Sequence, residues 1–254
     1  MDASQPIDEG EPMDDCLLDG LLEVVVLHLA DAEAAQAGGA DRVEVCVRKG
    51  LEEMSPAPTD VRTIVRGTDL AVRVVLRLSE GFGTTGGEVT RLSGLAGDYL
   101  SAGADGVAFG FLNADLDIDL GVCAALVDAL DGASWTLHRV IDHTLDTDRA
   151  WRQLRALPGL DSVLTAGSAL GVDTGKDDLE RRASADPEVA RLMLVGGGLQ
   201  AEHVPWLLRA GIRKFHLGSS VRPDGSWDKA YVDPAFVRSW RTLVDDHVRR
   251  LPSA

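Results

Sequence analysis

A short phrase that occurs twice constrains the fold of this chain more than any other feature. It reads AGGADRVEVC over 37–46 and SAGADGVAFG over 101–110. In each copy a helix-forming stretch ends at glycine, and a run rich in β-branched residues follows. Glycine takes the left-handed conformation after a helix without steric cost, so the chain can turn directly into a strand. The phrase is therefore interpreted as a repeated joint between a helix and a strand.

Further units of the same kind fill the rest of the chain, and two looser copies of the phrase lie at 154–167 and 207–218. Apolar runs bounded by glycine, proline or polar residues predict eight strands, at 22–27, 42–46, 71–77, 106–110, 135–139, 162–165, 192–195 and 213–217. Helical periodicity alternates with these runs, at 31–37, 60–65, 88–101, 119–130, 146–156, 177–191, 202–209 and 234–251.

Eight strands alternating with eight helices in 254 residues predict an α/β fold with a single (β/α)8 TIM barrel. The alternative is a doubly wound open sheet. Such a sheet usually has fewer strands, and no GxGxxG motif follows the first strand here.

The first twenty residues differ in composition from the rest of the chain. Residues 1–20 contain seven acidic side chains and neither lysine nor arginine, within a net charge of −16. This segment is predicted to be a disordered extension, followed by one barrel domain over 21–254. An acidic chain lacks the excess positive charge that attracts nucleic acid or an anionic membrane. No apolar run in the sequence is long enough to span a bilayer. Neither nucleic acid nor a membrane is therefore expected as a partner.

The number and spacing of the cysteines indicate the cellular compartment. Cys16, Cys46 and Cys123 form no CxxC pair and no disulfide framework. The N-terminus lacks the basic and apolar regions of a signal peptide. A cytoplasmic location is therefore expected.

Chemistry in a TIM barrel lies at the carboxyl ends of its strands. In the strand at 42–46, Arg42, Glu44 and Cys46 share one face, and Val43 and Val45 share the other. The valines suit the apolar layer beneath the helices, so the charged set is expected to point into the barrel. One interpretation is a structural ion network in the barrel floor, and the other is a site containing Glu44.

Other strand ends supply the remaining catalytic candidates. His138 is expected to point inward from the end of the strand at 135–139, and Asp142 follows closely enough for an acid–base pair. A hydrogen bond from the histidine to a backbone carbonyl is the alternative. Arg77 ends the strand at 71–77. Either Arg77, or Glu23 with Arg42, is expected to pair with the inward charged side chains. The predicted catalytic set is therefore Glu44, Arg77, His138 and Asp142.

Glycine clusters after the last two strands indicate an anion site. Barrels often hold a phosphate on backbone N–H groups of these two loops. The predicted contacts are Gly196, Gly197, Gly198, Gly218 and Ser219. Tight turns also favour glycine, so a purely structural role stays open. No lysine lies at the end of a predicted strand, which argues against a Schiff-base mechanism.

The segments LLEVVV, GADRVEVC, SAGADGVAFGFL, LHRVID, SVLTAG, LVGGGLQAEHV and FHLGSS occur in order from Leu21 to Ser220. Together they resemble the CutC family, which is named for copper homeostasis. The resemblance implies a cytosolic TIM barrel, often a homodimer or homotetramer. The family's residue pattern falls on Glu23, Arg42, Glu44, Cys46, Arg77, His138, Arg139 and Asp142.

The chain departs from that family pattern at three places. Valines at 24–26 follow Glu23 where the family usually has a cysteine, LEEMSP replaces an EGGLTP stretch, and RLSEGFG lacks a second arginine and a Gly-Gly-Asp. Cys46 is then the remaining thiol near the predicted barrel mouth, and His28 and Met54 are its candidate partners. A mixed Cys–His site has one thiolate, so weak copper binding at most is expected, and no other cofactor.

Three functions are consistent with the sequence. The first is a CutC-like role in copper homeostasis through Cys46 and His28. The second is a barrel enzyme that acts on a small anionic or phosphorylated substrate. The third is a barrel without surviving chemistry, which serves as a binding or assembly module.

Overall fold

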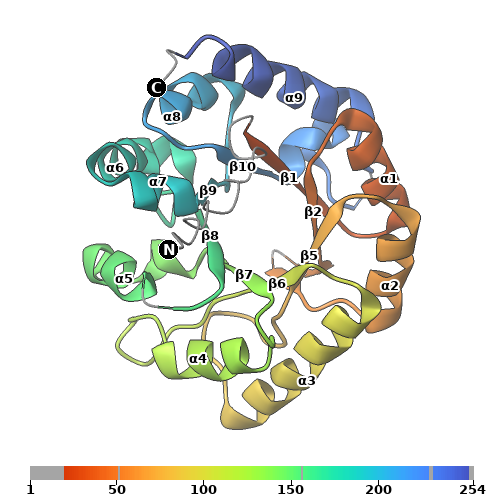
Figure 1. The fold of residues 1–254 in the computed structure, drawn as a ribbon, viewed down its shortest axis with the longest axis vertical. Coiled ribbons are helices and arrows are strands. Elements are labelled where there is room, and N and C mark those ends of the chain that lie inside the picture. Colours follow the sequence, from red (N-terminus) through yellow and green to blue (C-terminus); the bar gives the residue numbers. More distant parts are fainter. Residues whose placement is uncertain (1–19, 51, 156, 229–230, 252–254) are drawn as a thin grey trace, which may run out of the picture.

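The computed structural model describes residues 20–50, 52–155, 157–228 and 231–251 (Figure 1). The predicted acidic extension at 1–20 lies outside these residues, except for Gly20. None of the described helices is long and apolar enough to cross a membrane.

In the described part of the chain, eight parallel strands close a barrel in the order β1-β2-β5-β6-β7-β8-β9-β10 and back to β1. This closure confirms the predicted TIM barrel and is inconsistent with an open sheet. The strands are β1 (Leu21–Val26), β2 (Arg42–Val45), β5 (Ala71–Val75), β6 (Gly106–Phe109), β7 (Ser134–Leu137), β8 (Leu160–Thr165), β9 (Met193–Val195) and β10 (Lys214–Leu217).

The helices form a ring outside the strands (Figure 1). They are α1 (Leu29–Gly38), α2 (Pro58–Gly67), α3 (Gly86–Ala102), α4 (Leu120–Asp128), α5 (Thr147–Leu154), α6 (Val172–Ala185), α7 (Pro187–Leu192), α8 (Val204–Arg209) and α9 (Pro234–Val248). The helix predicted at 177–191 is thus two helices. Asp186 is extended before Pro187 and caps α7, because a residue that precedes proline disfavours the helical conformation.

The repeated phrase has the structure that its sequence predicts. Gly39 ends α1 with φ 91° and Gly103 ends α3 with φ 102°, both in the left-handed region. Each strand begins within a few residues of its glycine, because both caps redirect the chain at once. The side chains of Val43 and Val45 in β2 then pack in the apolar layer between strands and helices.

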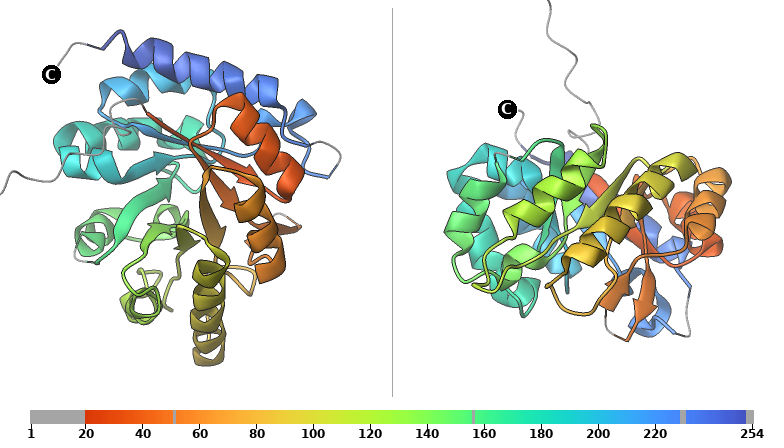
Figure 2. Two further views of the ribbon diagram at one scale, coloured as in Figure 1. Left: turned by 45° about the vertical axis from the view of Figure 1, so that its right-hand side comes forward. Right: turned by 90° about the horizontal axis from the view of Figure 1, so that it is seen from below.

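One element is absent from the prediction. A two-stranded antiparallel hairpin, β3 (Val47–Lys49) and β4 (Glu52–Met54), follows β2 directly. In Figure 2 it projects from one end of the barrel, on the same side as the loop that follows β10. The guanidinium of Arg48 lies 4.4 Å from the ring centre of Trp227 in that loop. The hairpin therefore covers part of the barrel mouth.

Candidate functional site

The floor of the barrel is an ion network. Nε of Arg42 is 2.5 Å from Oε2 of Glu23, and its Nη1 is 3.5 Å from Oδ2 of Asp161. Nη2 of Arg73 also reaches Asp161, at 2.5 Å. The ammonium of Lys214 donates to the Asp161 carbonyl at 2.6 Å. These contacts satisfy the buried charges, so the structural interpretation of Arg42 applies at this level of the barrel.

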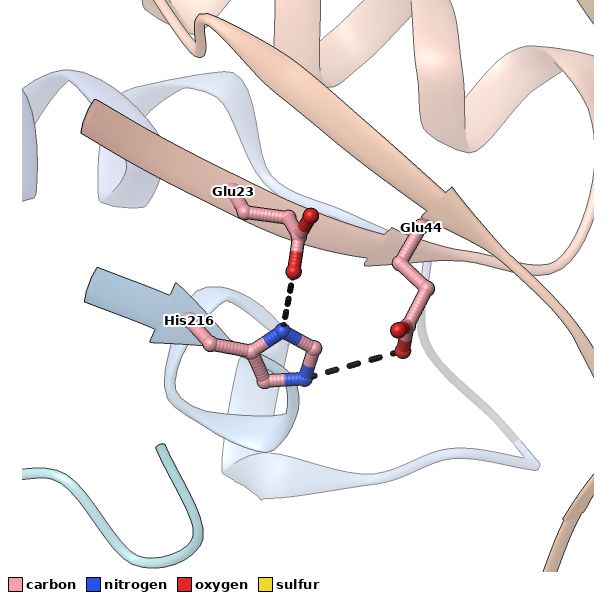
Figure 3. A group of neighbouring side chains, drawn as sticks. All are labelled: Glu23, Glu44 and His216. Atoms are coloured by element: carbon pink, nitrogen blue, oxygen red, sulfur yellow. Dashed lines mark hydrogen bonds and ion pairs between the residues drawn. The ribbon is translucent and has the colours of Figure 1, made fainter. Parts of the chain in front are cut away.

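Above the floor, Glu23, His216 and Glu44 lie side by side inside the barrel (Figure 3). Oε1 of Glu23 accepts a hydrogen bond from Nδ1 of His216 at 2.7 Å. Nε2 of the same ring lies 3.9 Å from Oε2 of Glu44. These three side chains come from β1, β10 and β2, which are adjacent in the barrel.

Burial and neighbouring charges set the protonation of these groups. Burial raises the pKa of Glu44 to about 7, although His216 and His138 oppose the rise. Burial lowers the pKa of His216, but Glu44 and Glu23 outweigh it and raise the value to about 9. Glu23 is also buried, yet Arg42 and His216 hold its pKa well below the ordinary value. Near neutral pH, a proton therefore binds more readily to Glu44 than to Glu23.

A second imidazole approaches Glu44 from the other side. Nε2 of His138 is 3.8 Å from Oε2 of Glu44 and 3.1 Å from Oε2 of Glu53. Glu53 comes from β4 of the hairpin, and His138 follows β7 directly. Glu44 is therefore common to two groups of neighbouring donors, one with Glu53 and His138 and the other with Glu23 and His216. We call Glu44, Glu53, His138 and His216 the central cluster.

A cavity of about 380 Å³ lies above the central cluster at the carboxyl ends of the strands. His216 and Glu53 belong to its lining, together with Arg139, Arg222 and Trp227. The loops after β9 and β10 supply Gly197, Gly198, Gly218, Ser219 and Ser220. Four of the five predicted anion contacts therefore line this cavity. The fifth, Gly196, lies beside them and donates its N–H to the Thr165 carbonyl.

Asp142 contacts Arg139, not the predicted partner His138. Its Oδ2 accepts from Nε of Arg139 at 2.7 Å and from the N–H of Ala166 at 2.9 Å, and its Oδ1 accepts from the Thr165 hydroxyl. A 3-10 turn at Val140–His143 follows β7 and carries Asp142 toward β8. Asp142 therefore fixes the Arg139 guanidinium at the cavity wall.

Arg77 binds the loop after β5. It donates to the carbonyls of Ser79 and Gly81, and its Nη2 is 2.5 Å from Oε2 of Glu52. These contacts join that loop to the hairpin. They place Arg77 at the rim, where it organises loops around the cavity.

Cys46 and His28 lie in different environments. Cys46 is buried with Val25 and Val75, and burial raises its thiol pKa well above the ordinary value. His28 caps α1, where its Nδ1 accepts from the Asp31 N–H at 3.2 Å. Neither residue belongs to a described group of three or more metal-ligating side chains.

Copper(I) prefers two or more soft thiolate or thioether ligands at one place. Of the described cysteines, Cys46 lies in a small cluster inside the barrel, while Cys123 packs in the outer core on α4. The groups of converging donors are carboxylates and imidazoles instead. The described residues therefore do not fit a copper(I) centre.

Three residues near the cavity lie outside the predicted catalytic set. His216 has the inward parity of its strand. Glu53 lies in the unpredicted hairpin, and no periodicity marks it. Arg222 forms a fully buried ion pair with Asp31, which brings together residues 191 positions apart.

A closed parallel barrel with a polar interior and a cavity at the carboxyl ends of its strands defines a (β/α)8-barrel protein with its candidate site in the usual place for this fold. The model of the CutC family matches residues 20–221. The chain therefore belongs to the CutC family.

Two relatives agree with this assignment, and a solved structure shares the fold. The chain is 30% identical to a CutC family protein of Bacteroides thetaiotaomicron, over 91% of this chain and 93% of that protein. It is 29% identical to one of Pasteurella multocida, over 77% and 80% of the two chains. A crystal structure described as a candidate copper homeostasis protein CutC, from Streptococcus agalactiae, aligns with a TM-score of 0.70 at 20% identity, covering 78% of this chain and 98% of that one.

Proposed function

We propose that this protein is an enzyme that acts on a small anionic substrate, such as a phosphorylated or carboxylated metabolite, bound in the mouth cavity. The observation that carries the proposal is the position of Arg139 against Gly197. Nε of Arg139 is held by Asp142 and Nη2 by the Ser168 carbonyl. Nη1 makes no hydrogen bond with the described residues and lies beside Gly197, in the lining of the cavity.

This arrangement suits an anion. A guanidinium with a fixed orientation presents its remaining N–H groups in a geometry that matches phosphate or carboxylate oxygens. Ser219 and Ser220, in the loop after β10, also line this cavity. A volume of about 380 Å³ suits a small metabolite.

The central cluster supports a reaction and not binding alone. His216 and Glu53 line the cavity, so a substrate anchored at Arg139 has its free end near buried imidazoles and carboxylates. Such side chains transfer protons or hold cations in enzymes. Asp142 acts in this scheme as a positioning residue, because it touches Arg139 and not the cavity contents.

The test is a phosphate titration of the full chain, followed by thermal unfolding. Phosphate up to about 50 mM is expected to raise the melting temperature of the wild type, because it binds the native state. Arg139→Gln should lose most of this rise, while the exposed surface substitution Arg249→Gln should keep it. Lack of any rise in the wild type, or an equal rise in Arg139→Gln, would argue against the anion site.

A CutC-like role in copper homeostasis is the second candidate function. Its support is the description of the Streptococcus agalactiae protein and the donor groups inside the barrel. Those donors suit copper(II) better than copper(I). Cys46 and Cys123 are both free thiols, which supports a cytoplasmic location. Family membership supports a homodimer or homotetramer.

A further inference from the structure

We propose that the central cluster, Glu44, Glu53, His138 and His216, binds one divalent transition-metal cation at the floor of the mouth cavity. The inference deepens the proposed function and uses the same cavity, because it names the electrophile that would face the free end of the substrate. It rests on the geometry of the cluster, independently of the anion site.

The first observation is that Glu44 lacks hydrogen-bond partners. Its side chain is fully buried, and neither carboxylate oxygen has a hydrogen-bond partner among the described residues. Burying a carboxylate without a partner is costly, so such a group normally pairs with a cation. Oε2 of Glu44 lies 3.8 Å from Nε2 of His138 and 3.9 Å from Nε2 of His216. Two imidazole nitrogens therefore face one carboxylate oxygen.

These separations are too long for hydrogen bonds but close to those of atoms that share an ion. Two donors at about 2.1 Å from one tetrahedral metal ion lie about 3.4 Å apart. Donor atoms of Glu44, Glu53 and His138 lie within 4.8 Å of one another, as do those of Glu23, Glu44 and His216, whereas the two rings belong to different groups. Coordination of one ion by both rings therefore requires the rings to move toward each other around Glu44.

His216 is already oriented as metal-binding histidines are. Glu23 accepts a hydrogen bond from Nδ1, which directs Nε2 toward Glu44. Arg42 fixes Glu23 in turn, at 2.5 Å. A carboxylate that holds the remote ring nitrogen sets the tautomer and orients the ring in metal sites. Glu23 is thus a positioning residue for the ion and need not touch it.

His138 and Glu53 complete the donor set. Nε2 of His138 and Oε2 of Glu53 lie 3.1 Å apart. If both atoms bound one ion, this contact would be replaced by the two bonds to the ion. Two imidazoles with two carboxylates suit zinc, iron, cobalt or manganese and lack the thiolates that copper(I) prefers. Because His216 and Glu53 line the cavity, the ion is reachable from it. With four protein donors the ion is closed when tetrahedral, so a substrate would bind it as a fifth ligand or in place of one donor.

A second group of donors on the surface provides an internal comparison. Asp173, Glu202 and His203 also lie close together, but both carboxylate residues are exposed. Both ring nitrogens of His203 are engaged, Nδ1 by the Gln200 N–H and Nε2 by Asp173 at 2.9 Å. This group has no buried carboxylate without a partner, so we expect it to bind a cation weakly.

The experiment is a titration of the metal-free full chain with Co²⁺, whose visible absorption reports its coordination, followed by displacement with Zn²⁺. One equivalent should bind the wild type. Glu44→Gln keeps the shape of the side chain but removes its charge, and should weaken binding by at least about 100-fold. Glu53→Gln should also weaken it. The matched control Glu202→Gln alters the surface group and should leave binding unchanged.

Three results would overturn the metal site: no saturable Co²⁺ or Zn²⁺ binding in the wild type, binding that persists in both Glu44→Gln and Glu53→Gln, or binding that is lost in Glu202→Gln. Circular dichroism of each metal-free variant checks that it is folded. The phosphate titration on metal-free protein separates the two proposals. Phosphate binding without metal binding would support the anion site and refute the metal site. Metal binding without phosphate binding would support the metal site and refute the anion site.

Discussion

Asp31 at the start of α1 and Arg222 after β10 form an ion pair wholly inside the protein. Nη2 of Arg222 lies 2.7 Å from Oδ2 of Asp31, and the two side chains are 1% and 0% exposed. The same carboxylate accepts the N–H groups of Leu27 and Val232. The pair therefore ties the loop after the first barrel strand to the loop after the last, and holds Arg222 in the cavity wall.

Asp31→Asn is expected to destabilise the protein strongly. It leaves the Arg222 charge buried beside a neutral amide, which costs about 3–5 kcal/mol when one partner of a buried pair is removed. Urea unfolding monitored by circular dichroism measures the loss. The exposed control Asp128→Asn should stay within about 0.5 kcal/mol of wild type. A loss for Asp31→Asn no larger than that of the control would contradict the role assigned to the pair.

Two neighbouring glycines allow a matched test of the anion site. Gly197 and Gly198 both have positive φ, so alanine strains the backbone at either position. A Cβ at Gly197 would overlap Nη1 of Arg139, whereas a Cβ at Gly198 meets nothing within 4 Å. We expect Gly197→Ala to lose about tenfold or more in phosphate affinity, with a smaller change in Gly198→Ala. Equal losses in calorimetric titrations would show that strain, not the guanidinium, controls binding.

Lys214 predicts a pH dependence of stability. Burial lowers its pKa to about 8 from an ordinary value of 10.5. Between these values the unfolded chain holds a proton that the native state has released, so the free energy of unfolding rises with pH. Unfolding curves from pH 7.5 to 9.5 should show a gain on the order of 1–3 kcal/mol relative to Lys214→Met. Parallel pH profiles for the two proteins would refute the assignment.

Copper(I) is expected to bind poorly. The one described thiol inside the barrel, Cys46, is buried and protonated, because its pKa is raised, and a single thiolate makes a weak site. Competition with a copper(I) chelator should give weak binding to the wild type and no difference for Cys46→Ser. Tight one-to-one binding that disappears in Cys46→Ser would restore the copper function.

The sequence predicted the barrel because local signals repeat. Gly39 and Gly103 end α1 and α3 in the left-handed conformation, and the strands are short runs rich in apolar residues. The break between α6 and α7 was missed although Asp186 and Pro187 mark it. The hairpin was missed for a different reason: its strands are short and polar, and they are held by contacts such as Arg48 with Trp227 that sequence spacing does not reveal.

The candidate site was predictable in part. Strand parity correctly placed Glu44 and His138 inside the barrel, since alternate side chains face opposite sides of a sheet. Their partners were not predictable in the same way. Glu53 arrives on the hairpin, and Asp142 turns away toward β8, so both pairings depend on loop conformations. Position along a strand thus identified the participants more reliably than the pairs they form.

The ion network in the barrel floor also affects how stability responds to temperature. Exposing apolar surface on unfolding raises the heat capacity, whereas exposing polar surface lowers it. A barrel centre that contains Arg42, Arg73, Asp161 and Lys214 therefore adds less to the heat capacity of unfolding than the branched apolar layers common in this fold. The stability curve is accordingly expected to be flatter, with a wider interval between cold and heat denaturation than an apolar-filled barrel of equal maximum stability would have.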